Sequence, residues 1–449
     1  MEKKNITELL SQIGIKPIDR QESDVLVWQQ FYEGKVDKFH EYMEYQGETQ
    51  VKRNRKSLHM AKVISELWSD NIINPETNFF TGNEASQKWL DAYIDKHNVK
   101  GRLNAFYELT FAFGIGATVQ YRDGNSKAIN QYVRYDNIYP FEVINEEITG
   151  CAFASVDNDI IFIQVHQKQG SLWVIQNLYF TENGERLSNE GRAIPTFLSQ
   201  EKLFQIHQPA IVNNINIGNH MGLSVFANAL EELKSVDIAY DALDKEIRNG
   251  RMRVYVQGEA LTYVQGESRP LFNKDQDEFY LLPPDAKNIE GTLVKVEAPT
   301  LRVEQLIENL KTQLNLLGAK CGLGDNAFYS DGGSIYTNTE QVVSSNSKFY
   351  KTRTKHTTNF HTPLIEMIKG LYYLENNRLL TDSCYAEFDD SIIHDKDKEY
   401  ARVMQMFNAG LIDRIEVYMQ LYKMSEQEAI EFNNKMTSRM ALPQDMDEE

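Results

Sequence analysis

The chain has 449 residues, 65 acidic against 47 basic side chains and a formal net charge of −18. With 41% hydrophobic residues it can bury a substantial core, and its length favours two to four structural regions. The longest apolar run, 109–119, is shorter than the roughly 18 residues that span a bilayer, and no apolar segment follows Met1. We therefore expect neither a membrane protein nor a secreted one, but a soluble intracellular protein.

The N-terminal hundred residues are expected to be mainly helical. Short helices on the outside of the fold are predicted for about the first forty residues. Apolar residues at helical spacing predict a helix over 58–68, and another is predicted over 86–97. From about Phe106 the pattern changes, and short β-rich runs separated by turn residues predict an antiparallel sheet region up to residue 210. These runs are 118–121, 151–155, 160–165, 172–175 and 178–180.

The middle of the chain predicts two helices joined by a small β insert. Apolar residues recur at three- and four-residue steps from Phe226 to Ile247, and Gly250 stands at the expected C-cap. Strand-like runs follow between 253 and 296. A second apolar stripe, from Val303 to Leu317, predicts a helix that ends near residue 322. The stripes can pack within one chain, between subunits, or partly both ways.

The C-terminal part begins with a glycine-rich loop over 322–334. A long helix is predicted from about 339 to 374, which Pro363 should end or kink. Two short helices separated by Gly410 follow. A capping box at 425–428 should open a third, before an acidic tail at 445–449. The predicted fold class is α+β.

Enzyme chemistry finds no support in the motifs. The sequence has no GxxxxGK[ST], HExxH or GxSxG, so we expect no enzyme, no cofactor and no metal. Cys151, Cys321 and Cys384 are too few and too far apart for a disulfide framework or a zinc site, and free buried thiols are expected. The acidic residues between 387 and 397 could serve a metal-dependent nuclease if they converged on one point, but a solvated loop is the preferred interpretation. They are Glu387, Asp389, Asp390, Asp395 and Asp397.

Several segments resemble portal proteins of long-tailed bacteriophages that infect Gram-positive bacteria. They are residues 57–68, 74–75, 222–226, 299–302 and 322–324, and above all TNTEQVVSSNS at 337–347. Their order carries the resemblance, which spans nearly the whole chain. Asn338 departs from the pattern, because relatives usually have a small residue there. The alternatives are another ring-forming head or tail protein and the nuclease mentioned above.

The resemblance implies the portal fold and a division of the chain. The wing would be 1–222 and 338–380, the stem helices 223–250 and 300–321, the clip 251–299, the tunnel loop 322–337, and the helical crown with its acidic tail 381–449. It also implies a ring of twelve subunits at one capsid vertex, through which double-stranded DNA is packaged and ejected without sequence specificity. The implied partners are the terminase large subunit, a head–tail connector or adaptor, and the major capsid and scaffolding proteins. The implied location is the virion, with assembly in the host cytoplasm.

Three sets of site residues follow. The loop from Gly324 to Gly333 lacks Lys and Arg, unlike a phosphate-binding loop, and its glycines permit movement, so it is the candidate constriction. The constriction set is Asp325, Asn326, Phe328, Tyr329 and Asp331. Basic residues on the stem could tune the passage of DNA or could be ordinary solvated residues: Lys234, Lys245, Arg248, Lys311 and Lys320. The candidate docking set of the clip is Arg251, Arg253, Arg269, Lys274 and Asp277. The acidic balance of the chain opposes adhesion to DNA but not its passage.

Overall fold

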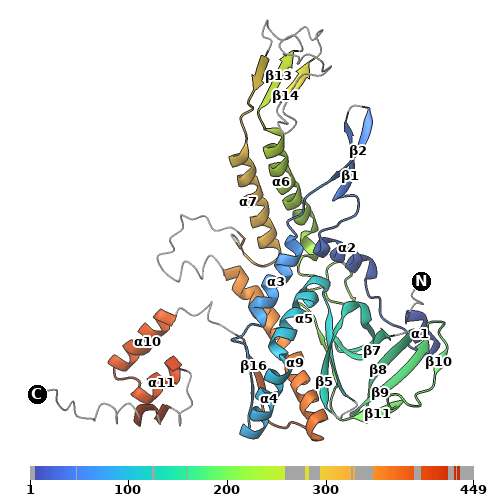
Figure 1. The fold of residues 1–449 in the computed structure, drawn as a ribbon. Coiled ribbons are helices and arrows are strands. Elements are labelled where there is room, and N and C mark those ends of the chain that lie inside the picture. Colours follow the sequence, from blue (N-terminus) through green and yellow to red (C-terminus); the bar gives the residue numbers. More distant parts are fainter. Residues whose placement is uncertain are drawn as a thin grey trace, which may run out of the picture.

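The computed structural model describes residues 6–46, 48–123, 127–157, 159–257, 279–282, 294–324, 327–328, 347–388, 396–422, 429–430 and 432–434. The chain is an α+β protein, as predicted. A body of helices and antiparallel sheets carries a narrow extension, made of two helices with a small sheet at the far end (Figure 1). We call this extension the arm. It comprises α6, β13, β14, β15 and α7.

Helices form one side of the body. They are α2 (Glu22–Glu33), α3 (Met60–Ile72), α4 (Glu84–His97), α5 (Val99–Phe113) and α9 (Ser347–Asn376), with the short α1 (Ile6–Gln12) at the edge of the sheets. The predicted helices over 58–68 and 86–97 are confirmed. The first forty residues contain two helices at the surface of the body, as predicted. Trp28 of α2 and Leu10 of α1 are buried, since each helix packs an apolar side into a core.

The start of the predicted sheet region is also wrong, because Phe106 to Phe113 belong to α5. Its last four residues, Thr110 to Phe113, are all buried, so the end of this helix is covered on every side. A helix covered on all sides lacks the one-sided stripe that identifies a surface helix. Gly114 ends it with φ +80°, and a Cβ there would lie 2.5 Å from the carbonyl oxygen of Gly222. Only glycine fits this close approach.

Antiparallel sheets form the other side of the body. One sheet has the order β10-β9-β8-β7-β6 with β11 also on β9, and another has the order β12-β4-β5. The strands are β4 (Gly116–Arg122), β5 (Ala128–Arg134), β6 (Ile138–Ile144), β7 (Glu147–Asp157), β8 (Ile160–Gln169), β9 (Leu172–Thr181), β10 (Arg186–Leu187), β11 (Thr196–Ser199) and β12 (Phe204–His207). All five predicted runs lie in strands, and the last two form the single strand β9. The sheet prediction therefore holds for 116–207.

Helix α9 crosses the sheet β12-β4-β5. It contains Pro363 and continues through it to Asn376, so this proline does not end the helix. The predicted first residues of this helix, 339–346, lie outside the described residues. After α9 the strand β16 (Cys384–Glu387), in the segment assigned to the crown, pairs with β3 (Asn78–Thr81) of the body.

The arm has the predicted order of helix, small sheet and helix. Helix α6 (Leu230–Asn249) ends at Gly250 as expected, and α7 (Val303–Lys320) packs along it. Between them β13 (Arg253–Gln257) pairs in parallel with β14 (Phe279–Leu282) and antiparallel with β15 (Val294–Glu297). Beside α6 a hairpin that the sequence did not predict, β1 (Glu41–Gln46) and β2 (Thr49–Asn54), projects from the body (Figure 1).

Two further helices, α10 (Lys396–Asn408) and α11 (Arg414–Tyr422), lie on either side of Gly410, as predicted. The predicted capping box at 425–428 lies outside the described residues. Among the residues that are described, no helix is both long and apolar enough to span a membrane.

Candidate functional site: the arm and its foot

The two arm helices bury their apolar stripes against each other and the body only near the foot of the arm. Leu233, Val236 and Ala239 of α6 and Leu317 of α7 are buried. In the described part of α6 beyond Asp241, and in α7 before Leu317, no side chain is fully buried. Part of each predicted stripe therefore packs within the chain.

Other aliphatic side chains of the arm face solvent. They are Ile238 and Ile247 of α6, and Ile307 and Leu316 of α7. Ile247 belongs to the predicted stripe, yet it is about half exposed. Exposed aliphatics of this kind cost little singly, but along one element they favour contact with another protein. The alternative of packing between subunits therefore stays open for the outer part of the arm.

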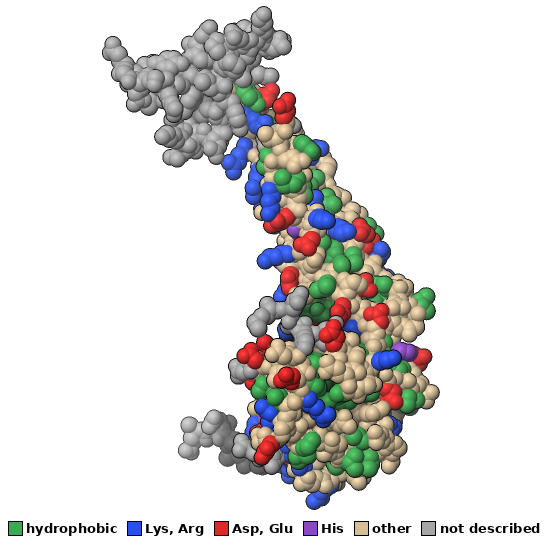
Figure 2. All heavy atoms as spheres, turned by 90° about the vertical axis from the view of Figure 1, so that its right-hand side faces the viewer, with side chains coloured by type: hydrophobic (Ala, Val, Ile, Leu, Met, Phe, Trp, Pro, Cys, Tyr) green, Lys and Arg blue, Asp and Glu red, His purple; other side chains and the backbone are tan. Residues whose placement is uncertain are grey.

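Each of the five basic residues predicted for the stem has a carboxylate partner. The pairs are Lys234 with Glu231 at 2.9 Å, Lys245 with Asp241 at 2.9 Å, Arg248 with Asp244 at 2.9 Å, Lys311 with Glu308 at 3.8 Å, and Lys320 with Glu232 at 2.7 Å. Four pairs join residues three or four apart on one helix, and the last joins the two helices. Acidic and basic side chains are consequently intermixed along the arm (Figure 2).

Two buried carboxylates fix α6 to the body. Asp237 accepts hydrogen bonds from the backbone N–H of Leu58, at 2.9 Å, and from Nε2 of His40, also at 2.9 Å. Nδ1 of His40 accepts the N–H of Val36 at 2.7 Å, so the imidazole proton is on Nε2 and points to Asp237. Asp241, one turn further along, is buried as well and accepts the backbone N–H of Lys56 at 3.4 Å. The direction of the arm is thus set by side-chain bonds at its foot.

A groove of about 470 Å³ separates α6 from the hairpin β1–β2. Charged residues of both signs and two tyrosines line it: Tyr42, Glu44, Tyr45, Arg53, Lys56, Asp241, Asp244, Lys245 and Arg248. Lys56 binds Asp244 at 2.7 Å, and this hydrogen bond lowers the pKa of the Asp244 carboxyl. Lys245 donates to the hydroxyl of Tyr42 at 2.7 Å. The cations already bind protein groups, so the groove is not an open phosphate site.

At the foot of the arm the end of α7 meets the start of α9. The indole N–H of Trp68 donates to the carbonyl oxygen of Cys321 at 3.1 Å, and its ring stacks on Phe349 with centroids 5.5 Å apart. A Cβ on Gly324 would lie 4.0 Å from the Cβ of Phe349. The chain therefore leaves α7 and re-enters α9 at nearly the same place.

The predicted constriction set is only partly described. Phe328 is half-buried and packs against the main core, beside α7, so its ring is anchored to the body. The other four members, Asp325, Asn326, Tyr329 and Asp331, lie outside the described residues.

The predicted docking and acidic sets are also described only in part. Of the clip, Arg251 is exposed and Arg253 is half-buried, while Arg269, Lys274 and Asp277 fall outside the described residues. Of the acidic cluster, the side chain of Glu387 alone is described, on β16. Within the described part of the chain no three His, Cys, Asp or Glu side chains gather in a way that could hold a metal ion.

Buried titratable groups in the body have structural partners. Burial lowers the pKa of His166, His207 and His356 to about 3. His207 lies between the Tyr107 hydroxyl and Thr118 Oγ1, at 3.1 Å from each. The cysteines are free thiols, as expected, and Cys151 and Cys321 are buried. Sequence reasoning did not find these histidines, because each is covered by residues far away in the chain.

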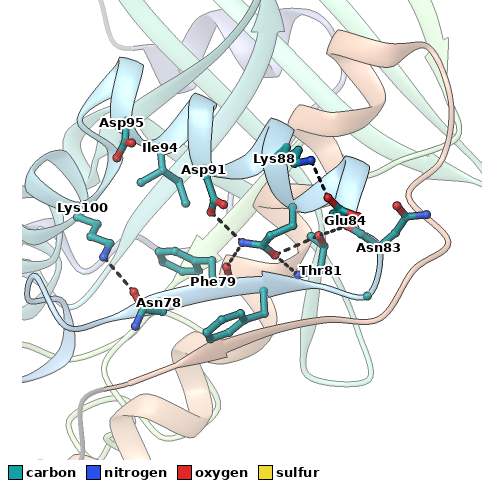
Figure 3. Close-up of a pocket in the computed structure, with 13 residues that line it drawn as sticks. Asn78, Phe79, Thr81, Asn83, Glu84, Lys88, Asp91, Ile94, Asp95 and Lys100 are labelled. Carbon is teal, nitrogen blue, oxygen red and sulfur yellow. Dashed lines mark hydrogen bonds and ion pairs between the residues drawn. The ribbon is translucent and has the colours of Figure 1, made fainter. Parts of the chain in front are cut away.

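A second groove, of about 890 Å³, lies between α4 and β3 (Figure 3). The amide of Gln87 occupies the edge of β3 there: it donates to the carbonyl oxygen of Phe79 at 3.1 Å and accepts the N–H of Thr81 at 2.7 Å. It also donates to Asp91 at 2.8 Å. None of the predicted site residues lies in this groove.

A comparison with solved structures found chains of similar fold. No family model matches the chain, and no curated protein matches it either. A chain in the structure described as the neck of a native GTA particle, computed with C12 symmetry, is similar to it with a TM-score of 0.44 and 12% sequence identity. The match covers 93% of this chain and 99% of that one.

Proposed function

We propose that the chain is a bacteriophage portal subunit, which forms a ring of twelve at one capsid vertex. The observation that supports this is the arm. Helix, small sheet and helix occur where the family resemblance puts stem, clip and stem, and the long helix α9 follows after the loop segment. Double-stranded DNA would pass through the ring during packaging and ejection. The chain would act by shape and assembly, without catalysis, cofactor or metal.

The charge pairs of the arm suit a channel wall. DNA carries about one negative charge per 1.7 Å of its axis, and unpaired lysines along the path would hold it. Each of the five basic residues is neutralised by a carboxylate, so a phosphate must displace that partner to bind. Such exchange gives weak contacts, which allow the polymer to slide.

The segment after α7 is the proposed constriction. Its described ends, at Gly324 and Phe349, lie together at the foot of the arm. A loop held at such a point in every subunit would extend toward a common axis. The clip would dock the terminase large subunit during packaging and the head–tail connector afterwards. The body would contact the major capsid and scaffolding proteins. The location would be the virion, after assembly in the host cytoplasm.

Electron microscopy of the purified full chain tests the proposal directly. We expect rings with an axial hole wide enough for a DNA duplex, and a particle mass near twelve subunits. A chain that stays monomeric under all assembly conditions, or rings without a hole, would contradict it. A packaging assay then separates a portal from other ring-forming head or tail proteins. Procapsids assembled without the chain should package no DNA, and adding it during assembly should restore packaging.

A further inference from the structure

A loop between β12 and α6, residues 208–221, exposes an unusual amount of aliphatic surface. The side chains of Val212 and Ile217 are 86% and 88% exposed, and Ile215 is 47% exposed. Single exposed aliphatics are common on protein surfaces, but three within six residues mark a contact surface. We call this segment the asparagine loop, after the residues that shape it.

The asparagine loop is held in shape by its own side chains. Oδ1 of Asn213 accepts the backbone N–H groups of Ile215, at 3.2 Å, and Asn216, at 2.9 Å. Its Nδ2 donates to the carbonyl oxygen of Met221 at 3.0 Å. A loop ordered in this way loses little conformational entropy when it binds a partner. Its aliphatic residues are therefore presented in advance.

The loop is also bound to the foot of the arm and to α9. Asn214 and Asn228, just before α6, exchange two side-chain hydrogen bonds of 2.9 and 3.0 Å. Asn359 of α9 donates to the carbonyl oxygen of Gln208 at 2.8 Å, and the N–H of Ala210 donates to His356 at 3.0 Å. The loop thus moves with the root of α6 and not independently of it.

The partner must be an uncharged protein surface. Residues 208–219 contain no Asp, Glu, Lys or Arg, in a chain with 25% charged residues. In the last two residues of the loop, the one titratable side chain is that of His220, which contacts Glu146 at 3.1 Å. A nucleic acid would require cations at the contact, and an anionic lipid surface would favour them. Apolar side chains on an ordered backbone instead fit an apolar depression in a folded protein.

We propose that the asparagine loop packs against a second copy of this chain in the ring. The inference rests on the proposed function. A ring that closes on itself is built from head-to-tail contacts, in which each copy offers two different surfaces. The loop is bonded to the start of α6, and the arm that begins there also exposes Ile238 and Leu316. Exposed aliphatic side chains therefore lie both on the loop bonded to the foot of the arm and on the arm itself.

A double variant, Val212→Asn with Ile217→Asn, removes the aliphatic surface and keeps the loop polar and uncharged. The concentration at which half of the chains are in rings should rise at least about tenfold, measured by mass photometry, because two aliphatic side chains lose their burial. The monomer should keep its circular dichroism spectrum and melting temperature, since both side chains are solvated. The matched control is Ile194→Asn with Leu198→Asn. These side chains are 67% and 61% exposed elsewhere on the body, and assembly should be unchanged.

A second measurement does not depend on weakened assembly. In a Cys384→Ser background, which leaves only the two buried native thiols, an Ile217→Cys thiol should react with a soluble thiol reagent at least about tenfold more slowly in rings than in monomers. The inference is overturned if the Ile217→Cys thiol reacts equally fast in rings and in monomers, or if the double variant assembles like the wild type. In either case, rings formed by the wild type still support the proposed function. A wild-type chain that never forms rings overturns both.

Discussion

The body and the arm are stabilised in different ways. In the body large side chains such as Trp68, Phe111 and Phe360 are fully buried, and polar groups like His207 find partners inside. Along the two arm helices full burial stops near the foot, and surface ion pairs predominate further out. Exposed ion pairs contribute only about 0–1 kcal/mol each. We therefore expect the outer part of the arm helices to be less stable than the body.

The largest loss of stability should occur at acidic pH, in the body. Burial lowers the pKa of His166, His207 and His356 to about 3 in the body, while the unfolded value is about 6.5. The unfolded chain thus binds more protons between these values, so stability falls as the pH falls below about 6.5. At pH 5 we expect a loss of roughly 2 kcal/mol per histidine. Urea unfolding at pH 7 and pH 5 measures it, and a His207→Gln variant should lose less stability between the two than the wild type.

A core substitution at the foot should come next in size. Trp68→Ala removes a fully buried ring and the hydrogen bond to the carbonyl oxygen of Cys321, so we expect a loss of about 3–5 kcal/mol. Chemical denaturation followed by circular dichroism measures it. Leu26→Ala, at an exposed position on α2, should change stability by less than about 0.5 kcal/mol. Equal losses in the two variants would contradict the packing described for Trp68.

A substitution at the attachment of the arm to the body should cost less stability than Trp68→Ala. Asp237→Ala leaves the N–H of Leu58 and the ring of His40 without their acceptor, at a cost of about 1–3 kcal/mol. Hydrogen exchange should become faster in α6, while the sheet β12-β4-β5 keeps its protection. If both regions lose protection equally, the arm and body unfold as one unit and the comparison above fails.

The smallest effect concerns DNA. Glu231→Gln leaves Lys234 without its carboxylate partner. If the freed lysine reaches a DNA phosphate, the logarithm of the DNA association constant should fall more steeply with the logarithm of the salt concentration. The slope should steepen by about 1 for each subunit that contacts the duplex. Filter binding of a short duplex at several salt concentrations measures this. Glu76→Gln, on the body, is the charge-matched control and should leave the slope unchanged.

The arm and the body also differ in how far the sequence predicts them. Helices α6 and α7 each have one apolar side and one polar side, so their spacing predicted both of them and the insert between. The last turn of helix α5 is buried on every side, and its aromatic residues resemble a strand pattern. The ion pairs between residues three or four apart on one helix could have been expected from their spacing. The ion pair between Lys320 and Glu232 depends instead on how the two helices pack. The sequence of the asparagine loop indicates a turn. Its hydrogen bonds to Asn228 and Asn359 could not be predicted, because they depend on how distant segments fold together.

The bond between Asp237 and the body lies in the first half of α6, sixteen residues before β13 begins. At about 1.5 Å per residue, the remaining helix is a lever of nearly 20 Å beyond this pivot. A rotation of about 10° at Asp237 would swing the far end of α6 by about 3 Å. A force on the far end of α6 would therefore reach His40 and Leu58 as a small torque, and a movement at these two residues would shift the far end in turn.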